Sequence, residues 1–391
     1  MAGPIYLDNS ATTRICPEAL RKYVEVSEEC YGNPSSLHDM GHKAEKLIRE
    51  AERTIIQSVR GKDARVIFTS SGSEANNLAI IGRAYAKTRY KSGGRIITFL
   101  GEHASVSEPC KRLESEGYSV EYLPTKGGEV DIAKLRSKLN ASVILVSCMM
   151  VNNETGAVYN LPAIAKAIKE LAPEAIFHVD ATQGYMKIPF SIDAIGADAV
   201  TLSSHKIEGP KGVGALVIRD SLLKTKGLSP IVFGGGQQAG LRSGTENVPG
   251  IAAFAEAVRV NMRDLSARIG RMQTLRDRLI GRLTSDGELA DISPTLPSSH
   301  APHILNITLP GIKSETMLHY LSSQGIYVSS GSACSSNSGH TSSALTAYGR
   351  RGDEADTSIR ISFGGENTAE DVDALCHALA TGLATLTRIK K

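Results

Sequence analysis

The most constraining feature of this chain is the alternation of short β-branched runs with helix-like segments through roughly its first 220 residues. This alternation indicates βαβ units, a mainly parallel sheet and helices packed on its faces. The predicted elements are strands at 66–69, 95–99, 143–147, 176–179, 199–202 and 214–218, and helices at 43–58, 74–90, 106–116 and 161–171. Ligands bind such sheets beyond the carboxyl ends of the strands, so polar residues that follow a strand are the first candidates for a site.

The pattern changes near Pro249, and 391 residues exceed what one hydrophobic core usually serves. A long helical stretch is predicted from Pro249 to Leu283. Beyond it we expect strands at 304–307, 326–328 and 359–362, helices at 314–324 and 369–388, and a Ser/Gly-rich segment at 329–343. We therefore predict an α/β protein with a large domain at 15–255 and a smaller α+β domain formed by 1–14 and 256–391.

The composition is that of an ordinary globular protein, with 41% hydrophobic and 22% charged residues and a net charge of +3. No block of Lys and Arg indicates a nucleic-acid surface, and no apolar run approaches a membrane span. The first residues lack the order of a signal peptide, so we expect a cytoplasmic protein. The six cysteines show neither CxxC pairs nor zinc-ligand spacing, so no metal site is expected.

Lys206 and Asp180 each follow a predicted buried strand, which would bring an amine and a carboxylate to one edge of the sheet. Pyridoxal phosphate (PLP) requires this pair: its aldehyde forms a Schiff base with an amine, and its ring nitrogen stays protonated beside a carboxylate. His103 follows the strand at 95–99 and would reach the same edge, where an imidazole can stack on a ring. A single His is also common as a structural residue.

Gly72 and Ser73 lie where a strand passes into a helix, so free backbone N–H groups and a hydroxyl can bind an anion there. An ordinary helix cap is the alternative. Ser203 and His205, together with a Gly-rich loop that includes 242–245, would add donors from other sides. These donors together are suited to a phosphate group.

Cys334 lies in the Ser/Gly-rich segment, which gives a thiol the exposure and freedom that a catalytic cysteine needs. An incidental surface cysteine is the alternative. Arg360 stands between apolar neighbours and is costly to bury without an anion, so it indicates a clamp for a carboxylate.

Ordered sequence blocks along nearly the whole chain resemble the cysteine desulfurases of the NifS/IscS-like group, in the class-V aminotransferase family and fold type I of the PLP enzymes. The blocks are 6–13, 32–36, 102–103, 151–156, 178–183, 203–206, 209–212, 242–245 and 329–334. The resemblance implies a large domain with a mainly parallel seven-stranded sheet between helices and a smaller α+β domain. It also implies removal of sulfur from L-cysteine, which gives L-alanine and a persulfide on the enzyme.

By position, the resemblance implies that Lys206 forms the Schiff base, Asp180 contacts the ring nitrogen, His103 stacks on the ring and moves protons, and Cys334 is the nucleophile. The resemblance also implies that Asn153 and Gln183 contact the oxygen substituent of the ring, and that Arg360 and Asn33 contact the substrate carboxylate. The residues implied at the phosphate are Gly72, Ser73, Ser203 and His205, with Thr245 reaching the phosphate of the neighbouring subunit. The resemblance further implies an obligate homodimer. It also implies an acceptor for the sulfur, such as an iron–sulfur scaffold or an enzyme that thiolates cofactors or tRNA.

Some positions near the site depart from the family pattern. Ser71-Gly72-Ser73 stands where Gly-Ala-Thr is common, Ser204 replaces a frequent Gly, and Glu208 replaces a frequent Tyr, which changes the local charge. Selenocysteine lyase, or a related lyase or aminotransferase, is the alternative among enzymes. A non-catalytic scaffold is the alternative outside catalysis. Lys206, Asp180 and His103 argue against it, because a scaffold needs no electron sink.

Overall fold

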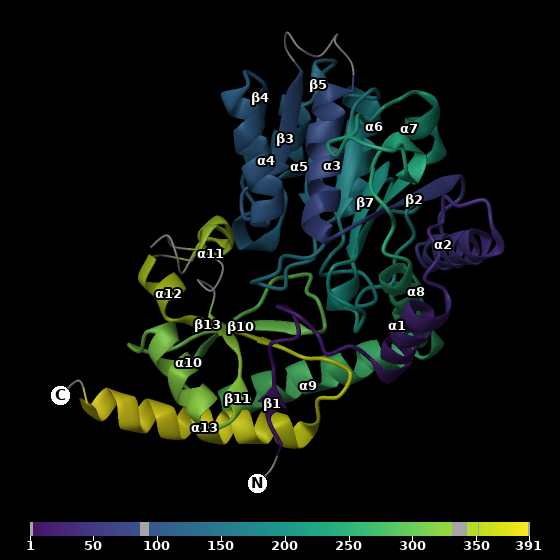
Figure 1. The fold of residues 1–391 in the computed structure, drawn as a ribbon. Coiled ribbons are helices and arrows are strands. Elements are labelled where there is room, and N and C mark those ends of the chain that lie inside the picture. Colours follow the sequence, from purple (N-terminus) through teal and green to yellow (C-terminus); the bar gives the residue numbers. More distant parts are fainter. Residues whose placement is uncertain (1–2, 87–93, 331–341, 351, 390–391) are drawn as a thin grey trace.

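A seven-stranded sheet forms the centre of the larger part of the molecule in the computed structural model, which describes residues 3–86, 94–330, 342–350 and 352–389 (Figure 1). The strand order is β2-β8-β7-β6-β5-β3-β4. The strands are β2 (Ala64–Thr69), β3 (Arg95–Phe99), β4 (Ser119–Leu123), β5 (Val143–Met149), β6 (Ile176–Asp180), β7 (Ala199–Ser203) and β8 (Gly214–Arg219). β8 is antiparallel to both neighbours and the other adjacent pairs are parallel, so the predicted sheet is confirmed.

The sequence pattern predicts all of these strands except β4. β4 pairs only with β3 at the edge of the sheet, and Leu123 is its one buried residue, so it has no apolar run. In contrast, all seven residues of β5 are buried, as expected for a parallel strand covered on both faces. Strand detection from apolar runs therefore works for the centre of the sheet and fails at its edge.

Helices cover both faces of the sheet, because successive side chains of a strand point to opposite sides. On one face Ile67 and Leu216 pack with α3 (Gly72–Tyr85), α4 (Ala104–Ser115) and α7 (Asp220–Lys224). The helices whose buried residues join the opposite face are α1 (Pro17–Glu29), α2 (Asp39–Ser58), α5 (Ile132–Lys138), α6 (Leu161–Leu171) and α8 (Val248–Arg263). The sequence pattern misses α1, which buries only Ala19 and Val26, and α5, which has seven residues.

The helix predicted from Pro249 to Leu283 is two helices, which corrects that prediction. α8 ends at Arg263 and α9 (Leu265–Ser285) begins after Asp264, whose φ of −136° and ψ of 34° are not helical. Phe254 of α8 packs in the core of the large sheet, whereas Leu279 of α9 packs in a second core. The break redirects the chain between two cores, and apolar spacing alone does not reveal a change of direction.

The second core surrounds a four-stranded sheet in the order β12-β13-β10-β9. Its strands are β9 (Ser293–Thr295), β10 (Ile304–Thr308), β12 (Ser329–Ser330) and β13 (Ser358–Ser362), and the helices in this part are α9, α10 (Ser314–Ser323), α11 (Ser343–Tyr348), α12 (Gly352–Asp356) and α13 (Ala369–Ile389). All of the strand pairs in this sheet are antiparallel. Short 3₁₀ turns lie at Lys126–Gly128, Ser204–Lys206 and Gln238–Gly240.

The N-terminal strand β1 (Ile5–Tyr6) pairs in parallel with β11 (Ile326–Tyr327), far away in sequence (Figure 1). Leu7 follows β1 and is fully buried in the second core. We propose on this basis that residues 1–14 and 256–391 form the small domain and residues 15–255 the large one. Val258 in the last turns of α8 still packs in the large core, so the two domains adjoin within α8.

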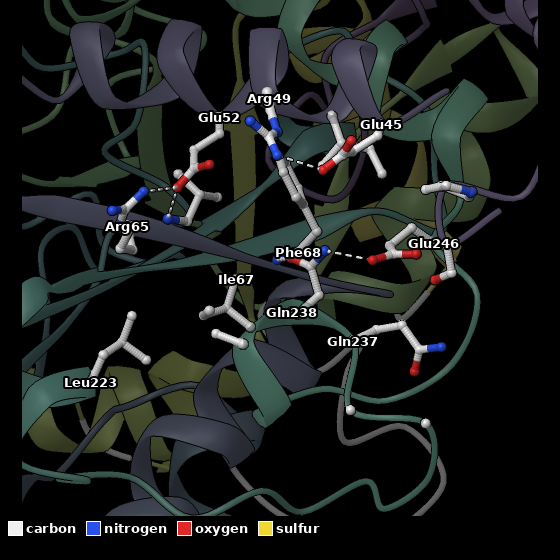
Figure 2. A pocket seen from close by; sticks show the side chains of 17 residues that line it. Glu45, Arg49, Glu52, Arg65, Ile67, Phe68, Leu223, Gln237, Gln238 and Glu246 are labelled. Atoms are coloured by element: carbon white, nitrogen blue, oxygen red, sulfur yellow. Dashed lines mark hydrogen bonds and ion pairs between the residues drawn. The ribbon is translucent and has the colours of Figure 1, made fainter. Parts of the chain in front are cut away.

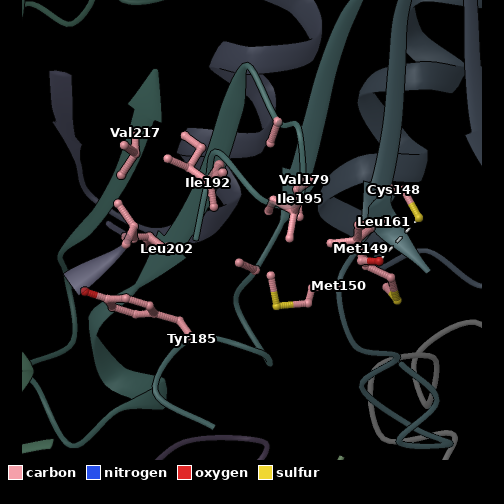
Figure 3. Close-up of a cluster of buried hydrophobic side chains, with 14 of the residues drawn as sticks. Cys148, Met149, Met150, Leu161, Val179, Tyr185, Ile192, Ile195, Leu202 and Val217 are labelled. Carbon is pink, nitrogen blue, oxygen red and sulfur yellow. Dashed lines mark hydrogen bonds between the residues drawn. The ribbon is translucent and has the colours of Figure 1, made fainter. Parts of the chain in front are cut away.

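A close-packed core supports the loops that follow β5 and β6 (Figure 3). Tyr185 is almost fully buried, and its hydroxyl lies 2.5 Å from Ser58 Oγ. A side chain at Gly184 would place its Cβ 2.2 Å from Met150 Sδ, so the Met150 side chain would have to move to admit it. The turn after β6 is thereby fixed against the end of β5. Within the described residues, no helix is long and apolar enough to cross a membrane.

Candidate active site

A cavity of about 480 Å³ opens at the carboxyl ends of β5, β6 and β7, beside the N-terminus of α3. Its wall is completed by the N-terminal segment at Asp8 to Ala11 and by β12 and β13 of the small sheet. The predicted site residues that line it are Gly72, Ser73, His103, Asn153, Asp180, Gln183, Ser203, His205, Lys206 and Arg360. The structure thus brings together ten residues that are dispersed over most of the sequence.

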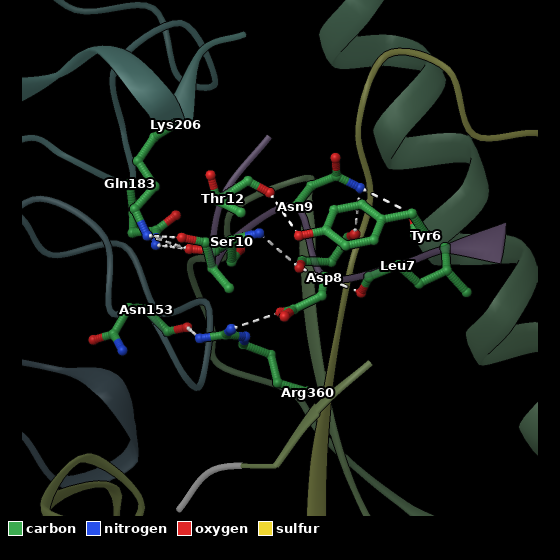
Figure 4. A network of polar contacts seen from close by, with 12 residues as sticks. Tyr6, Leu7, Asp8, Asn9, Ser10, Thr12, Asn153, Gln183, Lys206 and Arg360 are labelled. Atoms are coloured by element: carbon green, nitrogen blue, oxygen red, sulfur yellow. Dashed lines mark hydrogen bonds and ion pairs between the residues drawn. The ribbon is translucent and has the colours of Figure 1, made fainter. Parts of the chain in front are cut away.

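Lys206 lies in the 3₁₀ turn that follows β7, and its amine crosses to the N-terminal segment (Figure 4). Nζ donates to the carbonyl oxygens of Ser10, at 2.5 Å, and Ala11, at 2.8 Å. Gln183 Nε2 donates to the same Ser10 oxygen at 2.9 Å. Thr13 donates through both N and Oγ1 to the carbonyl of His205, which fixes the turn beside Lys206.

Asp180 ends β6, and both of its carboxylate oxygens accept hydrogen bonds. Oδ1 accepts from the Thr182 N–H at 2.9 Å, and Oδ2 accepts from Asn76 Nδ2 at 2.8 Å. Two residues earlier, His178 contacts Ser147 Oγ and Thr201 Oγ1, and burial lowers its pKa to about 4. His178 is therefore a neutral structural residue, whereas Asp180 presents an oriented carboxylate to the cavity.

His103 is the N-cap of α4 and lines the cavity. Its Nδ1 lies 2.8 Å from Ser105 Oγ and accepts from the Ser105 N–H at 3.1 Å. Burial lowers the pKa of His103, and the cations of Lys206 and Arg360 lower it further, while Asp180 opposes them. The imidazole is therefore neutral near pH 7.

The N-terminus of α3 forms a cradle for an anion. Ser71 Oγ accepts from the Glu74 N–H at 3.1 Å and caps the helix, and Glu74 is paired with Arg242 Nε at 2.8 Å. A Cβ at Gly72 would lie 3.2 Å from Thr182 Oγ1 and 3.3 Å from Ser203 Cβ, so a side chain there would crowd the cradle. The hydroxyls of neighbouring serines and the helix N–H groups supply donors of the kind that bind phosphate.

His205 adds a neutral donor or acceptor to this cradle. Its Nδ1 lies 3.1 Å from Thr12 Oγ1. Burial lowers the pKa of His205 to about 4, and the nearby Lys206 and Lys211 lower it in the same direction. The anion would therefore be held mainly by hydrogen bonds and the helix N-terminus, with Lys206 as the neighbouring cation.

Arg360 reaches the cavity from β13 and is 7% exposed. Its Nη2 donates to Asp8 Oδ1 and its Nη1 to the Asn153 carbonyl, each at 2.9 Å. Nε finds no acceptor among the described residues. A buried guanidinium whose Nε donor is unused is a suitable partner for a substrate carboxylate.

Four further residues of this site are absent from the sequence prediction. They are Asn76, Ser105, Asp8 and Glu154. Asn76 is a buried amide within the apolar stretch of α3, and this pattern is a usable signal. Ser105 contacts His103 locally at the start of α4, whereas Asp8 reaches Arg360 only through tertiary packing, so no local pattern identifies it.

Asn33 and Thr245 do not line this cavity. Asn33 Oδ1 accepts from the Ser35 N–H at 2.9 Å, and Thr245 is exposed. Segments next to both residues line a second cavity of about 650 Å³, which includes Pro34 and Gly236 (Figure 2). Cys334 lies outside the described residues.

Glu208, which departs from the family pattern, forms an ion pair with Arg268 of α9. It is absent from the residues that line the cavity. Its charge opposes the effect of burial on Lys187, whose pKa burial lowers to about 8. The substitution therefore changes the charge of a neighbouring cluster and not that of the cavity wall.

The model of the class-V aminotransferase family matches residues 5–375. This chain belongs to the class-V aminotransferase family. Its members use PLP, and the chain is a PLP-dependent enzyme of that fold. The amine, the oriented carboxylate and the anion cradle fit this cofactor, which when bound supplies an electron sink for the substrate.

Curated relatives match over nearly the full length of the chain. The protein named cysteine desulfurase IscS 1 of Archaeoglobus fulgidus is 37% identical over 375 residues, 96% of this chain and 95% of that protein. The putative cysteine desulfurase IscS 1 of Bacillus subtilis is 36% identical over 385 residues, 98% and 99% of the two chains.

Solved structures agree with the sequence relatives. A NifS-like protein superposes with a TM-score of 0.89 at 33% identity, covering 97% of this chain and 99% of its own. A structure described as SspA in complex with cysteine has a TM-score of 0.80 at 29% identity, covering 93% of this chain and all of the other. The predicted fold is confirmed by these matches.

Proposed function

We propose that this chain is a PLP-dependent cysteine desulfurase, which takes the sulfur of L-cysteine and releases L-alanine. The observation that supports this most directly is the convergence of Lys206, Asp180, His103 and Arg360 on one cavity. The names of the curated relatives favour cysteine over the selenocysteine-lyase alternative. The solved neighbour with bound cysteine supports the same substrate.

Each residue has a distinct task in this proposal. Lys206 holds the cofactor through its amine and moves the proton at the substrate Cα, since its amine lies at the cavity wall. Asp180, oriented by Asn76 and Thr182, keeps the ring nitrogen protonated. Arg360 binds the substrate carboxylate and is itself oriented by Asp8.

The remaining contacts hold the cofactor in place. We propose that Gly72, Ser73, Ser203 and His205 bind its phosphate and that Asn153 and Gln183 bind its ring oxygen side. All six line the cavity. Gln183 and Lys206 both donate to the Ser10 carbonyl, which would hold the amide and the amine at a fixed position relative to each other.

We further propose that Cys334 receives the sulfur. As a thiolate it attacks the substrate sulfur, so that an S–S bond forms while the substrate C–S bond breaks. Four of the described cysteines, Cys16, Cys110, Cys148 and Cys376, are buried, and burial raises the pKa of each. Cys30 is partly buried and does not line the cavity, so the Ser/Gly-rich segment is the most suitable position for a nucleophile.

The test is to supply L-cysteine and a thiol reductant to the holoenzyme and to measure alanine and sulfide. Cys334→Ala should abolish both products, and Cys30→Ala, which changes a partly exposed cysteine elsewhere, should not. Lys206→Ala should lose the bound cofactor's absorbance. Retained turnover in Cys334→Ala would exclude the thiol from the reaction.

A homodimer is part of the proposal, with Thr245 reaching the cofactor phosphate of the neighbouring site, while Asn33 stays a proposed partner of the substrate carboxylate. Large apolar side chains near both residues are exposed: Leu37 is 91% exposed and Phe233 81%. Pro34 and Gly236 line one cavity, so the two segments adjoin on the same face (Figure 2). An exposed apolar face of this kind is typical of a protein–protein interface.

Sedimentation of the holoenzyme should give a dimer, and Phe233→Ser should shift it toward monomer and lower activity. A native monomer with full activity would contradict this part of the proposal. We also propose a cytoplasmic location, because the five described cysteines are all free. We propose an iron–sulfur scaffold or a thiolation enzyme as the acceptor of the sulfur. Co-purification with a persulfide-accepting partner tests the acceptor.

A further inference from the structure

A chain of hydrogen bonds connects Asp180 to His103 beneath the cavity. Asn76 Nδ2 donates to Asp180 Oδ2 and also to Ser105 Oγ, each at 2.8 Å. Ser105 Oγ in turn lies 2.8 Å from His103 Nδ1. Asn76 is 1% exposed, so water does not compete for these contacts. Asp180, which is proposed to contact the ring nitrogen, and His103, which is proposed to stack on the ring, are therefore connected by hydrogen bonds through the side chains of Asn76 and Ser105.

The carboxylate and the backbone N–H at the two ends of this chain have fixed hydrogen-bonding roles. The carboxylate of Asp180 only accepts, so the Asn76 atom beside it is the amide nitrogen and not the amide oxygen. That nitrogen also donates to Ser105 Oγ, and the Ser105 hydroxyl proton remains free to be donated to His103 Nδ1. The backbone N–H of Ser105 points at the same atom at 3.1 Å and cannot reverse its direction. Two donors therefore meet at Nδ1.

We propose that Asn76 and Ser105 are positioning residues that lock His103 as the neutral tautomer with its proton on Nε2. A proton on Nδ1 would face a fixed N–H donor, so both the opposite tautomer and the imidazolium are disfavoured. Since Nδ1 is occupied by Ser105, Nε2 is the ring nitrogen left to meet a ligand in the cavity.

The lock defines what His103 contributes, if the proposed desulfurase function holds. Nε2 gives a hydrogen bond to the reacting groups, and it has no lone pair with which to take a proton. The charged groups that face the ring are Asp180 on β6, Lys206 after β7 and Arg360 on β13. Proton removal from the substrate is therefore left to Lys206, while His103 acts as donor.

The experiment is ¹⁵N NMR of the holoenzyme labelled at histidine, with His103→Gln used to assign the signals of this ring. We expect an unprotonated Nδ1 and a protonated Nε2 throughout pH 6 to 9. Ser105→Ala removes one of the two donors, and a hydrogen bond of about 1 kcal/mol corresponds to about a fivefold rise in the proton affinity of Nδ1. Ser115→Ala is the matched control, because this exposed hydroxyl of the same helix bonds only the Arg112 carbonyl.

A Nδ1-protonated ring at pH 7 to 8 in the unaltered protein would overturn the inference, as would Ser105→Ala titrating like Ser115→Ala. The tautomer is read independently of turnover. If alanine is formed but the tautomer is wrong, only this inference fails. If the tautomer is right but no alanine is formed, the inference stands and the proposed function fails. If Ser105→Ala does not fold, the spectrum of the unaltered protein still decides.

Discussion

Glu154 lines the cavity beside the Asn153 carbonyl that holds Arg360, and replacing it with Gln should make the protein more stable in alkaline solution. Its Oε2 accepts a hydrogen bond from Ser342 Oγ, which in turn caps α11 through the Leu345 N–H. Burial raises the pKa of Glu154 to about 7, although Ser342 and Arg360 oppose the rise. A glutamine keeps an oxygen for Ser342 and removes the charge.

The sign and size of the effect follow from the pKa. Between about pH 4.5 and pH 7 the folded protein binds a proton at Glu154 that the unfolded chain has released, so stability falls as pH rises. A rise from 4.5 to about 7 corresponds to at most about 3 to 4 kcal/mol at 1.36 kcal/mol per unit. Because the side chain keeps some contact with solvent, we expect Glu154→Gln to gain about 1–3 kcal/mol at pH 8 and less than about 1 kcal/mol at pH 5.

Urea denaturation of the holoenzyme at pH 5 and pH 8 measures this difference in the free energy of unfolding. Glu288→Gln, at an exposed glutamate of the small domain, is the matched control and should change stability equally at both values. If Glu154→Gln raised the free energy of unfolding by the same amount at pH 5 and pH 8, the reasoning would be refuted. That result would mean that Glu154 does not titrate between these values in the folded protein.

Two further predictions concern the small domain and the substrate. Leu7→Ala should lower the free energy of unfolding by about 2–5 kcal/mol in urea, because a fully buried side chain leaves a cavity in the second core. A loss below about 1 kcal/mol would contradict the assignment of the N-terminal segment to that core. Arg360→Ala should lower kcat/KM for cysteine roughly 10- to 100-fold in steady-state alanine formation, since a charge-assisted hydrogen bond is lost. An unchanged kcat/KM would exclude Arg360 from substrate binding.

The elements that the sequence pattern predicts correctly are those whose environment is uniform along the segment. β5 is buried on both faces, so its apolar run is sufficient to identify it. β4 is half-buried at an edge, and α1 buries only two residues, so neither has a clear periodicity. The break at Asp264 is invisible for another reason: helical spacing of apolar residues continues across it while the core they enter changes.

The site residues also differ in whether the sequence pattern can predict them. Asp180 and Lys206 follow parallel strands β6 and β7, so strand direction alone predicts that they meet. Arg360 reaches the cavity from a different sheet, and its partner Asp8 lies 352 residues away. Such contacts depend on how the two domains pack, which no local pattern records.

The sequence by itself predicted the central strands of the large sheet and the cofactor chemistry, and it indicated the amine and the carboxylate proposed to hold the cofactor, because each follows from local hydrophobicity and from residue type at strand ends. Only the tertiary structure decided which groups surround them. The direction of the hydrogen bonds from Asn76 through Ser105 to His103 depends on distances between α3, α4 and β6. Distances of this kind arise from packing, and packing is a property of the whole chain.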